Sequence, residues 1–88
     1  MSDNIQITRT THEKESLTLL GKRLKVLRAE ASLTQEELSD KAGFSRSYYA
    51  EVETGKRNPS YLNLVRISEA LEVSLHKLVS DGGHFDDT

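Results

Sequence analysis

The chain has 88 residues and a formal net charge of −2, and apolar side chains make up 35% of it. This length suits one small domain and leaves little room for an enzyme pocket of the usual size. No apolar run is long enough to cross a bilayer, and no basic-then-apolar secretory signal opens the sequence. The lack of cysteine excludes disulfides and Cys-ligated zinc, so we expect a cytoplasmic binding domain that inserts into no membrane.

Positive charge is concentrated in the middle of the chain. Residues 17–79 hold 10 basic and 8 acidic side chains, whereas residues 80–88 hold three acidic side chains and no basic one. The basic side chains cluster within 17–33 and 45–66. A local basic face can attract phosphates on a mildly acidic chain, but mixed charge on a solvated helix surface gives the same pattern.

The two ends of the sequence show no sustained apolar face. We therefore predict a flexible N-terminal arm at 1–15, a folded domain at 16–80 and a disordered acidic tail at 81–88.

Two helices are predicted in the first half of this domain. Apolar residues at helical spacing predict an amphipathic helix from about 16 to 31. Thr34 and Glu37 have the spacing of a capping box, which opens a second helix of about eight residues. Gly43 supplies the left-handed conformation that ends this helix. The apolar stripe of the first helix consists of Leu20, Leu24, Leu27 and Ala31.

Three further helices complete the predicted all-α, five-helix fold. Ser45 is a good N-cap for a third helix over 46–54, and Ser60 opens a fourth that ends near Leu71. Ser74 caps a short fifth helix. The expected core stripe of the fourth helix consists of Tyr61, Leu64, Ile67 and Leu71.

Residues 35–54 form one unit of two short helices joined by a tight turn. Ser39 is small, as a close crossing of the two helices requires. This arrangement is a helix-turn-helix, whose second helix can enter the ~12 Å wide major groove of DNA with its N-terminus first. The residues expected to lock the two helices together are Leu38, Ala42, Phe44, Tyr49 and Val52.

The runs LGKRLKVLRAEASL and TQEELSDKAGFSRSYYAEVETGKRNPSYLNLVRISEALEVSLHKL resemble the lambda-repressor/Cro-like (XRE-type) DNA-binding domain over residues 20–78. Within that family, SRSYYAEVETGKRNPSYLNL is similar to the controller proteins of restriction–modification systems. The sequence departs from the family pattern at Ser32, where glycine is common, at Ser39, where alanine is usual, and at Tyr49, where an aliphatic residue is usual.

The resemblance implies roles for three residues. Gln35 matches the family position that holds a DNA phosphate at the start of the second helix. Arg28 and Glu53 match an arginine and a glutamate that pair between the first and third helices, so we expect a structural ion pair that orients the third helix.

Side-chain chemistry indicates how the third helix would read bases. Arg46 has the reach for bidentate contact with guanine, Glu51 could accept a hydrogen bond from cytosine, and Ser47 and Tyr48 could contact bases or backbone. The alternatives are a solvated arginine, a serine bonded to its own backbone, a tyrosine packed on a neighbouring helix and a solubilising glutamate. The expected phosphate-binding residues after this helix are Lys56, Arg57, Asn58 and Ser60, with surface solvation as the alternative.

Leu62, Val65 and Val73 are apolar residues that the core stripe of the fourth helix leaves unexplained. Extra apolar surface on a small domain suggests a partner, and the resemblance implies a homodimer through the fourth and fifth helices. The alternative is a fully wrapped core. A dimer would bring two recognition helices to successive major grooves ~34 Å apart.

We expect neither catalysis nor a cofactor. His12, His76 and His84 lack metal-ligand spacing, and there is no nucleophile motif or phosphate-binding loop. The function hypothesis is a homodimer that binds a palindromic operator in double-stranded DNA and regulates transcription, either by covering a promoter or by touching RNA polymerase. Its setting could be a restriction–modification controller, an antitoxin or a phage-type repressor. The rival from another class is a protein-interaction adaptor on the same scaffold.

Overall fold

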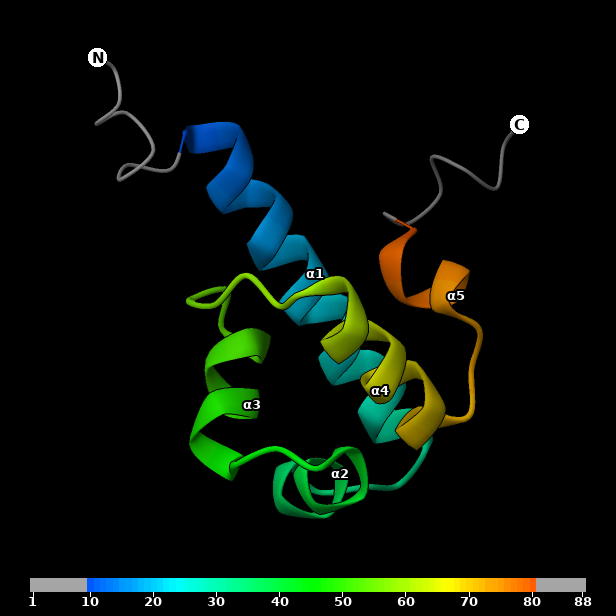
Figure 1. Cartoon of the computed structure of the whole chain (residues 1–88). Coiled ribbons are helices and arrows are strands. Elements are labelled where there is room, and N and C mark those ends of the chain that lie inside the picture. Colours follow the sequence, from blue (N-terminus) through cyan, green and yellow to red (C-terminus); the bar gives the residue numbers. More distant parts are fainter. Residues whose placement is uncertain (1–9, 81–88) are drawn as a thin grey trace.

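The computed structural model describes residues 10–80, which form five helices and no strand. The predicted all-α, five-helix fold is confirmed. Most of the predicted arm and the whole predicted tail lie outside the described residues. Figure 1 shows the arrangement of the helices, which are α1 (Thr11–Glu30), α2 (Gln35–Ala42), α3 (Arg46–Glu53), α4 (Tyr61–Leu71) and α5 (Leu75–Val79).

Helix α1 begins at Thr11, so the predicted start near residue 16 was wrong. A capping box sets the start: Thr10 accepts from the Glu13 amide, and the Glu13 carboxylate accepts from the Thr10 amide. The first turn contributes no apolar side chain to the core, so hydrophobic spacing could not reveal it. Ala31 was also misassigned to the core, because it is the exposed C-cap of the helix.

The other four helices begin at the predicted caps. In each case a serine or threonine hydroxyl accepts a hydrogen bond from the amide three residues further on. The predicted capping box at Thr34 is confirmed, and Gly43 ends α2 with φ +82° as predicted. The N-caps are Thr34, Ser45, Ser60 and Ser74.

One hydrophobic core joins all five helices. Helix α1 packs against α3 and α5, and α4 packs against α2 and α5. Tyr61, predicted in the core stripe of α4, is 67% exposed, because it stands at the first position of the helix where no neighbouring helix covers it. The core consists of Leu24, Leu27, Leu38, Ala42, Tyr49, Val52, Ile67, Ala70, Leu71 and Leu78.

The crossing of α1 and α3 depends on Gly21. A Cβ atom at this position would lie 2.2 Å from the backbone oxygen of Glu53, far closer than van der Waals contact. Only glycine therefore allows α1 to pass this close to the end of α3. This contact fixes the position of α3 on the body of the protein.

Candidate nucleic-acid interface

Helices α2 and α3 form a compact helix-turn-helix. Gly43 reverses the chain, and the Phe44 amide donates to the carbonyl oxygen of Ser39 at 2.9 Å. The Ser39 side chain is buried and its hydroxyl donates to the carbonyl oxygen of Gln35 at 2.6 Å. Serine at this position, where the family usually has alanine, thus keeps its polar atom satisfied inside a close helix contact.

The first turn of α3 carries the exposed side chains of the predicted base-reading set. Arg46 and Ser47 are exposed, while Tyr49, Val52 and Glu53 face the interior. Within residues 10–80, Arg46 makes no ion pair with a carboxylate. A long, charged donor therefore stands free at the N-terminal end of the helix.

The remaining two residues of that set, Tyr48 and Glu51, are held by other parts of the protein. The Glu51 carboxylate accepts from Arg57 Nε at 2.6 Å, which raises the pKa of Arg57. The Arg57 guanidinium lies over the Tyr48 ring, 5.5 Å from its centroid, and Asn63 Nδ2 donates to the Tyr48 hydroxyl at 3.0 Å. No motif in the sequence indicates a role for Asn63. Glu51 is thus paired with Arg57 in this structure through one of its two carboxylate oxygens, and its contact with cytosine stays a prediction.

Arg28 and Glu53 form an ion pair between α1 and α3. Arg28 Nε and Nη2 donate to the two carboxylate oxygens at 2.6 and 3.1 Å, and the Glu53 side chain is only 1% exposed. Burial alone would raise the pKa of Glu53, but the hydrogen bonds from Arg28, the nearby Tyr49 hydroxyl and the hydrogen bond from Gln35 outweigh it and leave this pKa below its usual value. The pair anchors the C-terminal end of α3 to α1.

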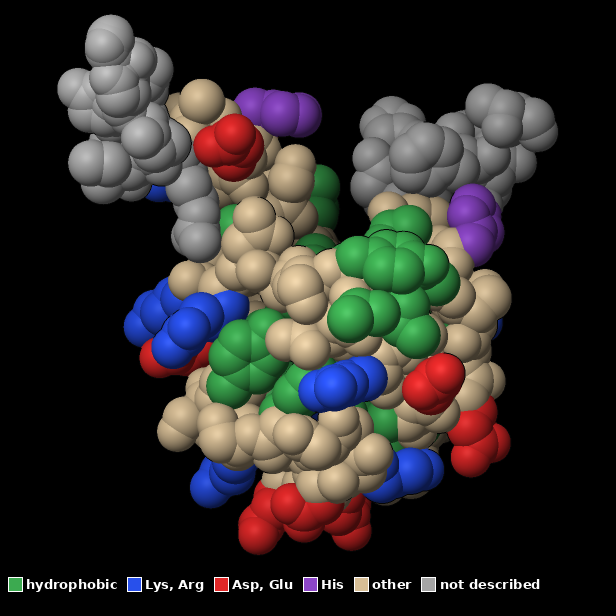
Figure 2. Space-filling view, in the orientation of Figure 1, with side chains coloured by type: hydrophobic (Ala, Val, Ile, Leu, Met, Phe, Trp, Pro, Cys, Tyr) green, Lys and Arg blue, Asp and Glu red, His purple; other side chains and the backbone are tan. Residues whose placement is uncertain are grey.

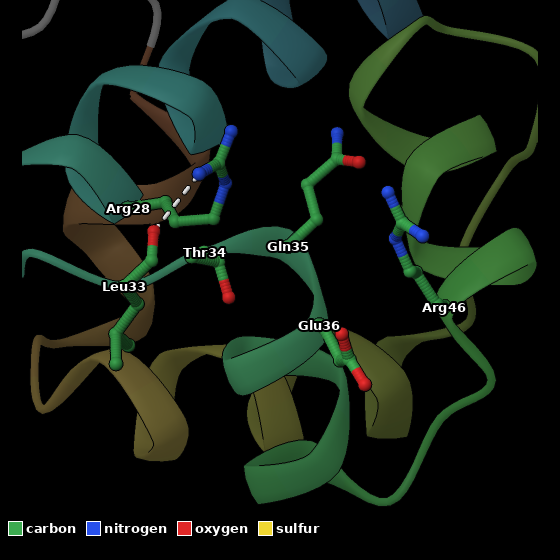
Figure 3. A pocket seen from close by; sticks show the side chains of 6 residues that line it. All are labelled: Arg28, Leu33, Thr34, Gln35, Glu36 and Arg46. Atoms are coloured by element: carbon green, nitrogen blue, oxygen red, sulfur yellow. Dashed lines mark hydrogen bonds between the residues drawn. The ribbon is translucent and has the colours of Figure 1, made fainter.

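Gln35 joins this ion pair. Its Nε2 donates to Glu53 Oε1 at 3.0 Å, an interaction that the sequence did not indicate. A side-chain amide has two donor hydrogens, so one remains for a phosphate. Figure 3 shows the Gln35 amide and the Arg46 guanidinium extending toward the same open space. That space is a pocket of about 420 Å³ lined by Arg28, Leu33, Thr34, Gln35, Glu36 and Arg46.

The other two departures from the family pattern are Tyr49 and Ser32, and the structure shows the surroundings of each. The Tyr49 ring is fully buried, and its hydroxyl has no hydrogen-bond partner within the part of the chain that the structure describes. Burial and the nearby Glu53 carboxylate raise the pKa of this hydroxyl. Ser32 has φ +60°, the left-handed conformation that explains why glycine is common there.

The loop between α3 and α4 presents the other predicted phosphate-binding residues. Lys56, Arg57 and Asn58 are exposed, and Ser60 caps α4. Figure 2 shows Lys and Arg side chains at the edge of the molecule where this loop lies, and acidic side chains over α2. The loop and the first turn of α3 therefore offer cationic groups beside the helix-turn-helix.

The predicted dimer-forming residues differ in exposure. Leu62 is 65% exposed, and Val65 and Val73 are half-buried. Figure 2 shows apolar side chains gathered near α4 and α5. Leu62 is thus available to a partner, whereas Val65 and Val73 offer only part of their surface.

Comparison with known proteins identifies the family. A helix-turn-helix family model matches residues 24–78. The chain belongs to the XRE-type helix-turn-helix family of transcriptional regulators. It is 44% identical over 62 residues to control protein C.MunI of Mycoplasma sp, covering 69% of this chain and 84% of that protein.

Two further matches are a phage repressor and a second controller protein. The immunity repressor protein of Bacillus phage phi105 is 39% identical over 62 residues, which cover 70% of this chain and 43% of the repressor. The crystal structure of the restriction–modification controller protein C.AhdI from Aeromonas hydrophila matches with a TM-score of 0.72 and 38% identity. That match covers 73% of this chain and 97% of the C.AhdI chain.

Residues 10–80 hold neither a candidate metal site nor a helix that could cross a membrane. No group of three His, Cys, Asp or Glu side chains in this range is placed to hold a metal ion. None of the described helices is long and apolar enough to span a membrane.

Proposed function

We propose that this helix-turn-helix regulator is a homodimer that binds a palindromic operator in double-stranded DNA. The observation that carries the proposal is the position of Arg46 and Ser47, exposed and adjacent on the first turn of α3. Arg46 would donate two hydrogen bonds to a guanine edge, which discriminates one base pair from the others. Ser47 would contact the next base or its phosphate.

Phosphate contacts would hold α3 in the groove. Lys56, Arg57 and Asn58 supply donors from the loop after α3, and Gln35 supplies its second amide hydrogen from the start of α2. The cap at Ser60 adds the backbone amides of α4. These groups carry affinity and orientation but little sequence information, because every phosphate is alike.

Two copies would pair through α4 and α5, with Leu62 at the contact and Val65 and Val73 beside it. The exposure of Leu62 supports this arrangement. A two-fold dimer reads two half-sites in opposite orientation, so its operator is a palindrome with half-sites about one helical turn apart. Binding the second half-site then becomes an intramolecular event, which raises the overall affinity.

The similarity to C.MunI and C.AhdI supports a restriction–modification controller as the setting. The similarity to the phi105 immunity repressor supports a phage-type repressor, and an antitoxin would use the same mechanism. In each setting the dimer would act in the cytoplasm by occupancy: it represses where it covers a promoter and activates where it touches RNA polymerase.

The experiment is selection of bound duplexes from a random pool, followed by titration of the selected duplex and of a random duplex at several salt concentrations. We expect the selected duplex to bind about 10³-fold more tightly or better, with affinity falling steeply as salt rises. Arg46→Ala should cost about 1–3 kcal/mol on the selected duplex and relax selection at one base position. Equal weakening on both duplexes would contradict base reading, and salt-insensitive or undetectable binding would favour the adaptor.

A further inference from the structure

Tyr48 is held on three sides by three different segments. The Phe44 ring meets it edge-on, with centroids 5.2 Å apart and planes at 64°. The Arg57 guanidinium covers the ring face, and Asn63 on α4 donates to the hydroxyl at 3.0 Å. The ring cannot swing toward a base edge without losing these contacts.

The hydrogen bond from Asn63 fixes the Tyr48 hydroxyl and leaves its proton free to be donated. A phenol oxygen offers one proton and two acceptor positions, and the Asn63 amide occupies one of the acceptor positions. The hydroxyl proton therefore remains available to another group. Accepting one hydrogen bond also polarises a hydroxyl and makes it a stronger donor.

The surroundings of this donor favour a negatively charged acceptor. Arg57 places its positive charge over the Tyr48 ring and is itself fixed by the bond from its Nε to Glu51. Glu51 bonds only to Nε of Arg57, so the two other guanidinium nitrogens can still attract a group that accepts a hydrogen bond from Tyr48. DNA phosphate oxygens are acceptors that carry negative charge, whereas base edges present neutral mixtures of donors and acceptors.

We propose that Asn63 is a positioning residue of the DNA interface and that the hydroxyl it holds binds a DNA phosphate. Tyr48 then contributes affinity and helps to position α3 on the DNA. The bases are read by the exposed first turn of α3. This inference rests on the proposed function, because it assigns partners within the same protein–DNA contact.

A double-mutant cycle on the full chain tests this assignment. Asn63→Ala, Tyr48→Phe and the double variant are titrated with a duplex that the wild-type chain selects from a random pool, and with a random duplex of equal length. Thermal unfolding verifies that each variant is folded, and sedimentation verifies that the change beside Leu62 leaves the oligomeric state unaltered. Asn58→Ala is the matched control, since Asn58 is exposed and makes no hydrogen bond to Tyr48.

We expect each single variant to bind both duplexes about three- to tenfold more weakly, the effect of one lost hydrogen bond, with the preference for the selected duplex unchanged. The double variant should bind no more weakly than Tyr48→Phe alone, whereas Asn58→Ala should keep its full effect when combined with Tyr48→Phe. An undiminished effect of Asn63→Ala on top of Tyr48→Phe would overturn the positioning role, and a changed duplex preference in Tyr48→Phe would overturn the phosphate contact. If the wild-type chain selects no duplex, the proposed function fails as well.

Discussion

Gly21 offers the sharpest test of how the body of the protein holds α3. Replacing it with alanine places a methyl group 2.2 Å from the Glu53 carbonyl oxygen and 2.7 Å from the Glu53 carbonyl carbon. Both atoms belong to the backbone, so no side-chain rotation can relieve the clash. Helix α1 and the end of α3 must therefore move apart.

Two opposing effects determine how much Gly21→Ala changes the free energy of unfolding. Alanine inside a helix is about 1 kcal/mol more favourable than glycine, which stabilises α1. To reach ordinary contact, the two backbones must separate by about 1 Å, and overpacking of this kind typically costs about 1–3 kcal/mol or more. The displacement also strains the buried bond between Arg28 and Glu53. Because the clash is between backbones, the cost lies in the upper part of this range, and after the alanine gain is subtracted we expect Gly21→Ala to lower the free energy of unfolding by about 1–2 kcal/mol overall.

Urea unfolding of Gly21→Ala beside the wild-type chain measures this effect. Ser16→Ala is the control, because Ser16 is exposed on the same helix and its change alters helix propensity with little effect on packing. The control should be neutral or slightly stabilising, and Gly21→Ala should unfold at lower urea and bind the selected duplex more weakly. If Gly21→Ala is as stable as the control, the close crossing of α1 and α3 does not hold α3 in place.

Three further predictions concern the ion pair, the buried tyrosine and the dimer. The pKa of Glu53 lies below its usual value of 4.5, so the ion pair stabilises the fold above pH 4.5 and this stabilisation is lost as the pH falls through the lowered pKa. In urea titrations, the difference in the free energy of unfolding between the wild type and Glu53→Gln should therefore shrink below pH 4.5. A difference that does not change with pH would contradict this role of the ion pair. The buried Tyr49 hydroxyl lies beside Glu53 without a hydrogen bond of good geometry, so Tyr49→Phe should unfold thermally with a stability equal to the wild type or up to about 1 kcal/mol higher. Any loss of stability would mean that the hydroxyl is bonded to Glu53. Leu62→Glu combined with Val65→Glu should sediment as a monomer, while an unchanged dimer would move the interface elsewhere.

Local signals in the sequence predicted most of the fold. The caps at Thr34, Ser45, Ser60 and Ser74 depend on residues within three positions of each helix start, so spacing alone reveals them. The start of α1 was predicted too late because its first turn has no apolar face, although Thr10 and Glu13 have the spacing of a capping box. The spacing of that pair predicts a helix start at Thr11.

The candidate site was harder to predict, because its contacts join residues distant in sequence. The side-chain chemistry of Arg46 predicted that it contacts bases from the start of α3, which requires an exposed position. The family resemblance implied that Arg28 and Glu53 would pair. Nothing local indicates that Gln35 bonds to Glu53 or that Asn63 reaches Tyr48, since both contacts depend on how the helices pack. From the sequence alone, Gly21 would be predicted only to weaken its helix. Its role in the crossing with α3 depends on how the helices pack.

Mapping the bound surface by nuclear magnetic resonance tests most directly whether the first turn of α3 faces DNA. The wild-type chain, labelled with nitrogen-15, is titrated with the duplex it selects from a random pool. We predict the largest amide shifts at Arg46, Ser47 and the loop over 56–58, with the outer face of α1 around the exposed Val26 unchanged. Shifts confined to α1, or none in the first turn of α3, would contradict the account.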